Sequence, residues 1–258
     1  MIEIRPEGRT RRWSGGEIGV MVSHGFTGTT ESVADWAQAL ADAGMRVVAP
    51  RLTGHATSWR DLDASRWQYW VDDVTRAFDE LERQCRFVFV AGLSMGGALA
   101  LRVAQTRPVA GVLLVNPAIA SHSPAINSAG ALRWVIPAAP GIASDIRLPG
   151  VVEPGYSHVS VRAVHQMTRL WAVVRRDLAA VSAPVVVFKS EVDHVVDDLS
   201  VELIRRWLPG AVVRNLRHSY HVATLDHDAA LIFSESVEII ERRAARLRHG
   251  YPGVSEPA

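Results

Sequence analysis

A short turn, Gly92-Leu93-Ser94-Met95-Gly96, separates two segments of opposite character and constrains the fold more than any other part of the chain. Residues 87–91 before it are apolar, β-branched and aromatic, which predicts a buried strand. Residues 97–104 after it have the pattern of a helix. A tight turn between a strand and a helix is strained and needs small flanking residues. Such a turn raises the Ser94 hydroxyl above the sheet edge and leaves the Met95 N–H at a helix N-terminus.

The same alternation of strand and helix continues on both sides of this turn. A G-x-S-x-G pattern alone arises by chance in roughly one chain in ten of this length, so its surroundings decide its meaning. Strands are expected at residues 18–23, 45–50, 87–91, 111–117, 184–189 and 211–214, and helices at residues 30–43, 65–84, 97–104, 200–208 and 231–247. Alternation of this kind predicts an α/β fold with a mostly parallel sheet covered by helices on both faces.

Residues 119–181 break this alternation. Prolines punctuate the segment, and only its last part has a helical pattern. Its apolar content must pack on something, so we expect a small helical cap inserted after a core strand. The expected organisation is a core of residues 1–118 and 182–258 with a cap insertion of residues 119–181. The tryptophans of the helical and cap-like stretches, Trp67, Trp70, Trp134 and Trp171, are expected to pack in the interior.

Composition excludes several classes of protein. The 258 residues include 28 Lys and Arg against 27 Asp and Glu, a balance that gives no electrostatic footprint for nucleic acid. The single cysteine, Cys85, allows no intramolecular disulfide and is expected to be a buried structural thiol. The charged N-terminal stretch has no apolar signal-peptide core, and no apolar run is long enough to span a bilayer. We expect a cytoplasmic protein; peripheral contact with a membrane stays open.

A serine hydroxyl becomes a nucleophile only when a base removes its proton, and a carboxylate usually orients that base. In enzymes with a serine at such a turn, the acid and then the histidine follow along the chain, each on a loop after a strand. Asp193 lies on the loop after the expected strand 184–189. Three other carboxylates compete for the role: Glu191 lies closer to the strand, whereas Asp197 and Asp198 resemble caps of the next helix.

His221 is the predicted base. It follows the last expected strand and directly precedes apolar residues and the closing helix. His218 lies on the same loop and is interpreted as a surface residue, and His227 as part of the start of the last helix.

A tetrahedral intermediate also needs hydrogen-bond donors for its oxyanion. The Met95 N–H is one candidate, and the Phe26 N–H on the loop after strand 18–23 is the second. His24 and His55 are interpreted as structural residues that hold loops.

Five motifs together resemble the bacterial monoacylglycerol lipases and the similar small carboxylesterases. They are His24-Gly25-Phe26-Thr27-Gly28, Arg51-Leu52-Thr53-Gly54-His55, Gly92-Leu93-Ser94-Met95-Gly96-Gly97, Asp193-His194-Val195-Val196 and Ser219-Tyr220-His221-Val222-Ala223-Thr224-Leu225-Asp226. They stand in the family's order, and the resemblance covers the chain from about residue 18 to residue 248.

The resemblance implies an α/β-hydrolase core with a small helical cap, no metal and no organic cofactor. It implies that Ser94 is the nucleophile, Asp193 the acid and His221 the base, with Phe26 and Met95 as the oxyanion hole. The implied reaction is hydrolysis of a small-molecule ester or lipid, monoacylglycerols or related short-to-long acyl esters, through an acyl-enzyme on Ser94.

The chain departs from the family pattern at two places. Ala56 follows His55 where the family usually has glycine. The cap residue that meets the glycerol headgroup in the family falls near Ser157 rather than on a carboxylate.

Other functions stay open at this point. An acyltransferase or a C–C bond hydrolase uses the same triad, and fold and triad do not choose between them. A non-catalytic ligand-binding relative is disfavoured by the intact triad and elbow. A haloalkane dehalogenase would need aspartate at Ser94.

Overall fold

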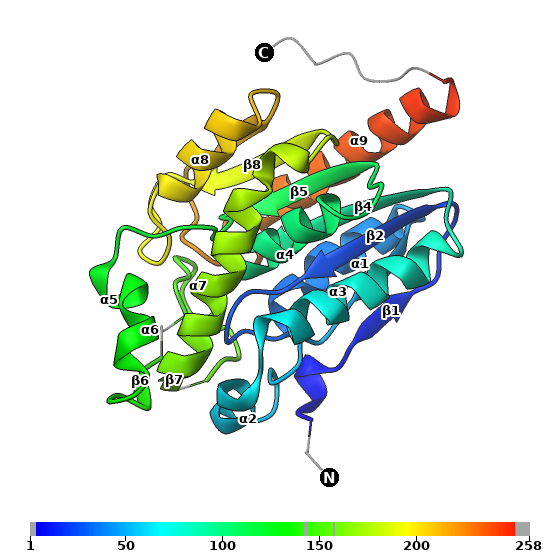
Figure 1. Cartoon of the computed structure of the whole chain (residues 1–258). Coiled ribbons are helices and arrows are strands. Elements are labelled where there is room, and N and C mark those ends of the chain that lie inside the picture. Colours follow the sequence, from blue (N-terminus) through cyan, green and yellow to red (C-terminus); the bar gives the residue numbers. More distant parts are fainter. Residues whose placement is uncertain (1–3, 142–143, 157, 251–258) are drawn as a thin grey trace.

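The computed structural model describes residues 4–141, 144–156 and 158–250. Seven strands form one sheet in the order β1-β3-β2-β4-β5-β8-β9 (Figure 1). All neighbouring strands pair in parallel except β1 and β3. The strands are β1 (Arg11–Trp13), β2 (Ile18–Ser23), β3 (Arg46–Ala49), β4 (Phe87–Leu93), β5 (Gly111–Val115), β8 (Val185–Ser190) and β9 (Val212–Leu216). The expected parallel sheet is confirmed, and β1 is an antiparallel edge strand that the polar N-terminal sequence did not predict.

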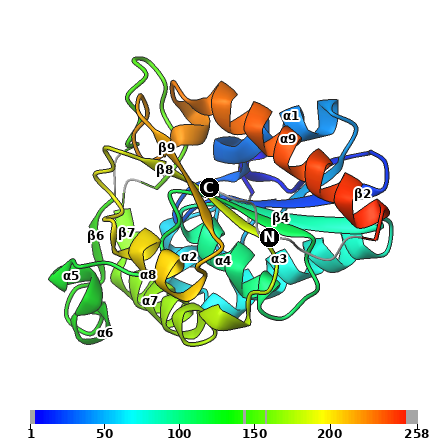
Figure 2. The same cartoon turned by 90° about the horizontal axis from the view of Figure 1, so that it is seen from above.

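Helices cover both faces of the sheet, as Figure 2 shows from above. One face carries α1 (Ala34–Asp42) and α9 (Ala229–Arg248), and the Trp36 indole N–H donates to Ser236 Oγ at 3.0 Å between them. The other face carries α3 (Trp67–Glu82), α4 (Met95–Ala104) and α8 (Leu199–Trp207), and α7 (Val161–Arg176) packs on α3 and α4. The sheet therefore separates two apolar cores, which explains why β2, β4 and β5 are almost wholly apolar rather than alternating.

The ends of several elements differ from the sequence expectation. The helix expected from residue 30 begins as a 3-10 turn, η2 (Thr30–Val33), and becomes α-helical only at α1. Thr29 caps this 3-10 turn, because its hydroxyl accepts the Glu31 N–H at 3.2 Å. A further helix, α2 (Trp59–Ala64), was not expected; it starts with a capping box between Ser58 and Asp61.

The insertion (residues 119–181) connects β5 to β8 and lies beyond the carboxyl ends of the strands. It contains α5 (Pro124–Asn127), α6 (Ala129–Leu132), β6 (Ala138–Pro140), β7 (His158–Ser160), α7 and η3 (Leu178–Ala180). The antiparallel pair β6–β7 was not expected in a helical insertion. Two further 3-10 turns, η1 (Pro6–Gly8) and η4 (Ala223–Leu225), complete the described elements.

The expected burial of the tryptophans holds for some and fails for one. Trp70 is fully buried and Trp171 is 3% exposed. Trp134 is 73% exposed, so the prediction that it packs in the interior is wrong. It lies just after α6, and its neighbours Val135 and Ile136 are also exposed, at 81% and 40%, so this segment is not part of the core. No helix within the described residues is long and apolar enough to cross a membrane.

Candidate active site

Ser94 stands at the sharp turn between β4 and α4, as the strand–turn–helix pattern predicts. Its backbone has φ 57° and ψ −121°, a conformation that L-residues rarely adopt. The flanking glycines are required by contact: a Cβ on Gly92 would lie 2.1 Å from the Gly96 oxygen, and one on Gly96 would lie 2.2 Å from the Ser23 oxygen. The backbone of the turn is therefore packed directly against strand β2, and this packing holds the strained serine in place.

His221 and Asp193 meet at the carboxyl edge of the sheet. His221 Nδ1 lies 2.9 Å from Asp193 Oδ2, and both side chains are buried. The other carboxylate oxygen of Asp193 accepts the N–H groups of Val195 at 2.9 Å and Val196 at 2.8 Å. Burial alone would raise the pKa of Asp193, but the hydrogen bond and charge of His221, together with these two N–H groups, lower it below its ordinary value. The carboxylate is thus kept ionised and oriented toward the imidazole.

Lys189, at the end of β8, brings a positive charge to the same carboxylate. Its Nζ lies 3.8 Å from Asp193 Oδ2 and 3.4 Å from Asp198 Oδ1, and it donates to the Ser190 oxygen at 3.0 Å. The residue is 8% exposed. In the sequence, Lys189 is simply the polar end of an apolar strand; only the loop that follows brings Asp193 back over it.

The loop after β2 carries the other predicted oxyanion donor, Phe26. The buried side chain of His24 contacts this loop and the loop after β3. His24 Nδ1–H donates to the Gly25 oxygen at 2.9 Å, and its Nε2 accepts the Leu52 N–H at 3.3 Å. One neutral tautomer satisfies both contacts. Burial lowers the pKa of His24 to about 4, so the ring stays neutral near pH 7. These contacts agree with a structural role for His24.

An aromatic cluster continues this support. The rings of His24 and His55 are 5.1 Å apart, and the Phe26 ring lies 6.2 Å from His55 and 6.0 Å from Trp70, all in edge-to-face arrangements. Burial lowers the pKa of His55 well below its ordinary value, and the neighbouring His24 adds to this effect. Ala56 has φ 58°, which explains in physical terms why glycine suits this position.

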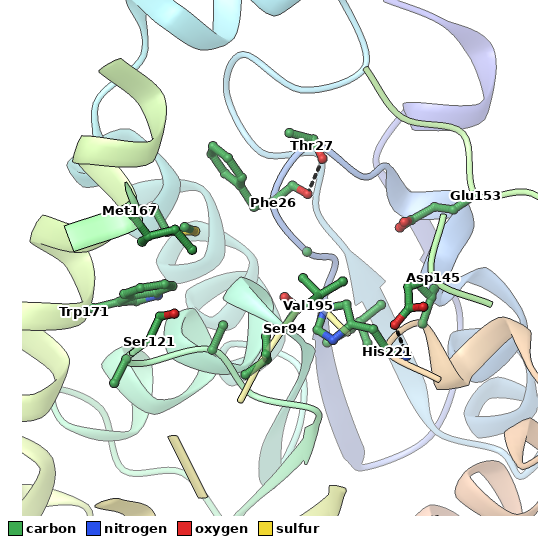
Figure 3. Close-up of a pocket in the computed structure, with 17 residues that line it drawn as sticks. Phe26, Thr27, Ser94, Ser121, Asp145, Glu153, Met167, Trp171, Val195 and His221 are labelled. Atoms are coloured by element: carbon green, nitrogen blue, oxygen red, sulfur yellow. Dashed lines mark hydrogen bonds between the residues drawn. The ribbon is translucent and has the colours of Figure 1, made fainter. Parts of the chain in front are cut away.

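A cavity of about 70 Å³ joins these parts, and Figure 3 shows its walls. Ser94 and His221 lie on its floor between two different sides. One side is polar and carries Glu153 and Asp145; the opposite side, with Met167 and Trp171, is mostly apolar. The apolar lining consists of Phe26, Leu93, Ala118, Ala120, Ile126, Met167, Trp171, Val195, Val196 and Val222.

The competing residues lie elsewhere. Glu191 pairs with Arg217 on the surface, and Asp197 accepts the His122 N–H at 2.7 Å. The Asp198 side chain is 80% exposed, and His218 and His227 line a separate shallow surface site. Of these five described residues, none lines the cavity that holds Ser94.

Two carboxylates of the cavity were missed by sequence reasoning. The predicted headgroup position, Ser157, lies outside the described residues, whereas Glu153 projects into the polar side of the cavity. A Cβ on Gly28 would lie 2.7 Å from Glu153 Oε1, so glycine at position 28 leaves room for this carboxylate. Burial raises the pKa of Glu153, against the opposing charge of His221. Asp145 is the second carboxylate. The available signal was an acidic side chain in the mostly apolar stretch between Pro140 and Pro149.

The described part of the chain contains no cluster of three or more His, Cys, Asp or Glu side chains arranged to hold a metal ion.

Comparison with known proteins gives consistent results. The sequence profile described as serine aminopeptidase, S33, matches residues 18–150. The chain is 36% identical over 234 residues to a thermostable monoacylglycerol lipase of Bacillus sp. (strain H-257), covering 89% of this chain and 92% of the relative. It is 23% identical to a carboxylesterase of Bacillus subtilis (strain 168), covering 89% of this chain and 95% of the relative.

A solved structure described for LipS and LipT, two metagenome-derived lipolytic enzymes, is 36% identical with a TM-score of 0.89, covering 93% of this chain and all of that chain. The structure of a Paleococcus ferrophilus monoacylglycerol lipase has a TM-score of 0.75 at 18% identity, covering 91% and 98%, and so supports the fold alone. From the profile match, the relatives and the shared fold together, this chain belongs to the serine aminopeptidase S33 family of α/β-hydrolases.

Proposed function

We propose that this chain is a serine hydrolase of carboxylic esters, with Ser94, His221 and Asp193 as its catalytic triad. The observation that carries the proposal is the 2.9 Å contact between His221 and Asp193 on the same cavity as the strained Ser94 turn. A monoacylglycerol lipase and a carboxylesterase among its relatives support the ester as substrate. The atom of the substrate that the Ser94 oxygen attacks is then the ester carbonyl carbon.

In the proposed reaction, His221 Nε2 takes the proton of the Ser94 hydroxyl while the oxygen attacks the ester carbonyl. Asp193 stabilises the imidazolium that forms. The N–H groups of Phe26 and Met95 bind the oxyanion, each typically contributing about 3 kcal/mol. The intermediate collapses to an acyl-enzyme, and His221 returns the proton to the leaving alcohol. Water then attacks the acyl-enzyme in the same way and releases the acid.

We propose a monoacylglycerol as the preferred substrate. The polar side of the cavity provides Glu153 close to His221, where a glycerol headgroup would leave as the alcohol. A carboxyl group with a raised pKa can accept hydrogen bonds from hydroxyls and, when protonated, donate one. The apolar side, with Met167 and Trp171, suits the acyl chain.

We also propose the organisation around this site. Residues 119–181 act as a cap over the core formed by residues 1–118 and 182–258, because α7 and the Glu153 loop supply both sides of the cavity. Peripheral contact with a lipid surface is supported by the exposed Trp134, Val135 and Val152 of this insertion. A cytoplasmic location stays part of the proposal.

Fatty-acid release from monoacylglycerols of increasing chain length tests this function, with the matching p-nitrophenyl esters measured in parallel. Ser94→Ala is the control and should lower kcat by roughly 10⁴-fold or more without changing the melting temperature. Full activity of Ser94→Ala would remove the nucleophile assignment. Turnover of activated short esters alone would identify a general carboxylesterase. Transfer of the acyl group to an added alcohol in preference to water would identify an acyltransferase.

A further inference from the structure

The carboxyl group of Asp145 lies between the loop of the proposed base and the loop of the proposed acid. Asp145 Oδ2 accepts the backbone N–H of His221 and the backbone N–H of His194, both at 3.1 Å. His194 directly follows Asp193. The backbone oxygen of Asp145 also accepts the Val222 N–H at 3.0 Å. One residue of the insertion thus holds both catalytic loops by their backbones.

A second carboxylate, Asp226, also links the His221 loop to the insertion. Here the carboxylate belongs to the loop, and the N–H groups belong to the insertion. Asp226 accepts the N–H groups of Arg147 at 2.7 Å and Leu148 at 2.9 Å. It also accepts the Tyr220 N–H at 2.9 Å, directly before His221. Asp226 is 4% exposed. We call Asp145 and Asp226 together the carboxylate clamp.

The backbone C=O and N–H groups of His221 are therefore bound by different parts of the molecule. Its carbonyl oxygen accepts from Asn116 Nδ2 at 2.8 Å, and Asn116 is a fully buried residue of the core. Its N–H is held by Asp145 of the insertion. The core therefore fixes the His221 carbonyl group, and the insertion fixes the His221 N–H group.

The second oxygen of Asp145 is also engaged. Its Oδ1 lies 2.8 Å from His194 Nδ1, and the His194 ring packs edge-to-face on Tyr220 with 4.7 Å between centroids. The Asp145 side chain is only 13% exposed. With both oxygens occupied, the carboxylate has one well-defined orientation.

We propose that Asp145 is a positioning residue for the general base. The carboxylate clamp fixes the position of the His221 backbone, so catalysis depends on the insertion being packed against the core. The inference rests on the proposed function of His221. The imidazole moves with its Cα, and a misplacement of about 1 Å at a reacting group can cost on the order of 10²-fold in rate. Loss of the Asp145 carboxylate would free the His221 N–H and loosen the Asp193 loop at once.

A different role for Asp145 would give different kinetics. Because Asp145 also lines the polar side of the cavity, it could contact the leaving alcohol instead. Loss of an alcohol contact present in both ground and transition states raises KM and leaves kcat unchanged. Loss of positioning lowers kcat and leaves KM nearly unchanged. The two parameters therefore separate the roles.

The experiment compares Asp145→Ala, Asp145→Asn and Asp61→Ala with the unmodified chain on a monoacylglycerol, which has glycerol hydroxyls, and on p-nitrophenyl butyrate, which has none. We expect Asp145→Ala to lower kcat roughly 30- to 100-fold with KM within about twofold. Asp145→Asn keeps an oxygen that can accept both N–H groups, so it should recover kcat to within about fivefold. Asp61→Ala removes a carboxylate of the α2 capping box, so it should lower the midpoint of urea unfolding without lowering kcat.

Titration of active sites with a fluorophosphonate corrects every rate for the folded fraction, so unfolding of Asp145→Ala is not mistaken for lost positioning. Unchanged kcat in Asp145→Ala, a rise in KM alone, or an asparagine variant as slow as the alanine variant would each overturn the proposal. The proposed function fails separately, through persistent activity of Ser94→Ala.

Discussion

The turn around Ser94 and the insertion that faces it across the cavity are built in opposite ways. From Leu93 to Leu101 every residue is buried, and the turn contacts β2 backbone to backbone. The insertion exposes large apolar side chains, with Val135 at 81% and Val152 at 74%. Among its described helices, only α7 packs against the core along its length. We infer that the core carries the reacting groups, while the insertion selects what reaches them and, through Asp145, holds the backbone of His221.

The largest loss of stability should come from adding a methyl group within the closely packed turn around Ser94. In Gly96→Ala the new methyl carbon would lie 2.2 Å from the Ser23 oxygen and 2.6 Å from the His24 oxygen. Because both contacts are backbone, relief requires shifting β2, and we expect a loss of about 3 kcal/mol or more with loss of activity. Gly210→Ala is the matched control, since its Cβ meets nothing within 4 Å. Urea unfolding of both variants tests this; equal stability would show that the turn is less rigid than its contacts indicate.

Acid should weaken the same rigid region next. The pKa of His24 is lowered to about 4, chiefly by burial. Between its unfolded value near 6.5 and this folded value, the unfolded chain binds the extra proton, so stability falls as pH falls through this window. The loss is of the order of 3 kcal/mol, and His55 acts in the same direction. Urea unfolding between pH 7.5 and pH 4 measures it. His24→Gln should flatten the dependence; an unchanged slope would exclude His24 as its source.

On the insertion side, Glu153→Ala should change selection rather than chemistry. Loss of a carboxyl group that hydrogen-bonds the glycerol hydroxyls should raise KM for a monoacylglycerol about tenfold. Hydrolysis of p-nitrophenyl butyrate, which has no such hydroxyls, should stay nearly constant. Glu191→Ala is the control, because that carboxylate pairs with Arg217 on the surface. Equal effects of Glu153→Ala on both substrates would contradict an alcohol-binding role.

The smallest effect is expected at the exposed end of the insertion. Trp134→Ala removes a side chain that is 73% exposed, so stability should change by less than about 0.5 kcal/mol. Turnover of dissolved p-nitrophenyl esters should be unaffected. If this surface meets lipid, hydrolysis of a monoacylglycerol presented in phospholipid vesicles should slow, and vesicle co-sedimentation should fall. Unchanged rates and binding in both formats would remove the proposed contact.

Local pattern was sufficient for most of the core. The apolar run of residues 18–23 becomes β2 with the expected bounds, and the stripe of α3 runs from Trp67 to Glu82 inside the expected range. Such patterns are readable because a strand buried on both faces is a continuous apolar run, whereas a helix buried on one face repeats its apolar residues every three to four positions. The edge strand β1 escaped prediction because only three residues pair, and two of them are arginines.

The insertion was less readable for the same reason. Prolines and exposed apolar residues leave no regular period between α6 and β7, so neither the pair β6–β7 nor the exposure of Trp134 was expected. Glu153 looks like any solvated carboxylate in the sequence. Its place in the cavity depends on the tertiary structure, which brings its carboxylate beside the distant Gly28.

The sequence by itself determined the strand–turn–helix at Ser94 and the order of serine, acid and histidine, because local residue types encode backbone conformation over a few residues. Only the tertiary structure decided which of the competing carboxylates and histidines meet, and that Asp145 reaches His221 across 76 positions. Those contacts follow from how the sheet orders its strands and where the insertion returns. Such long-range convergence has no periodicity along the chain from which it could be read.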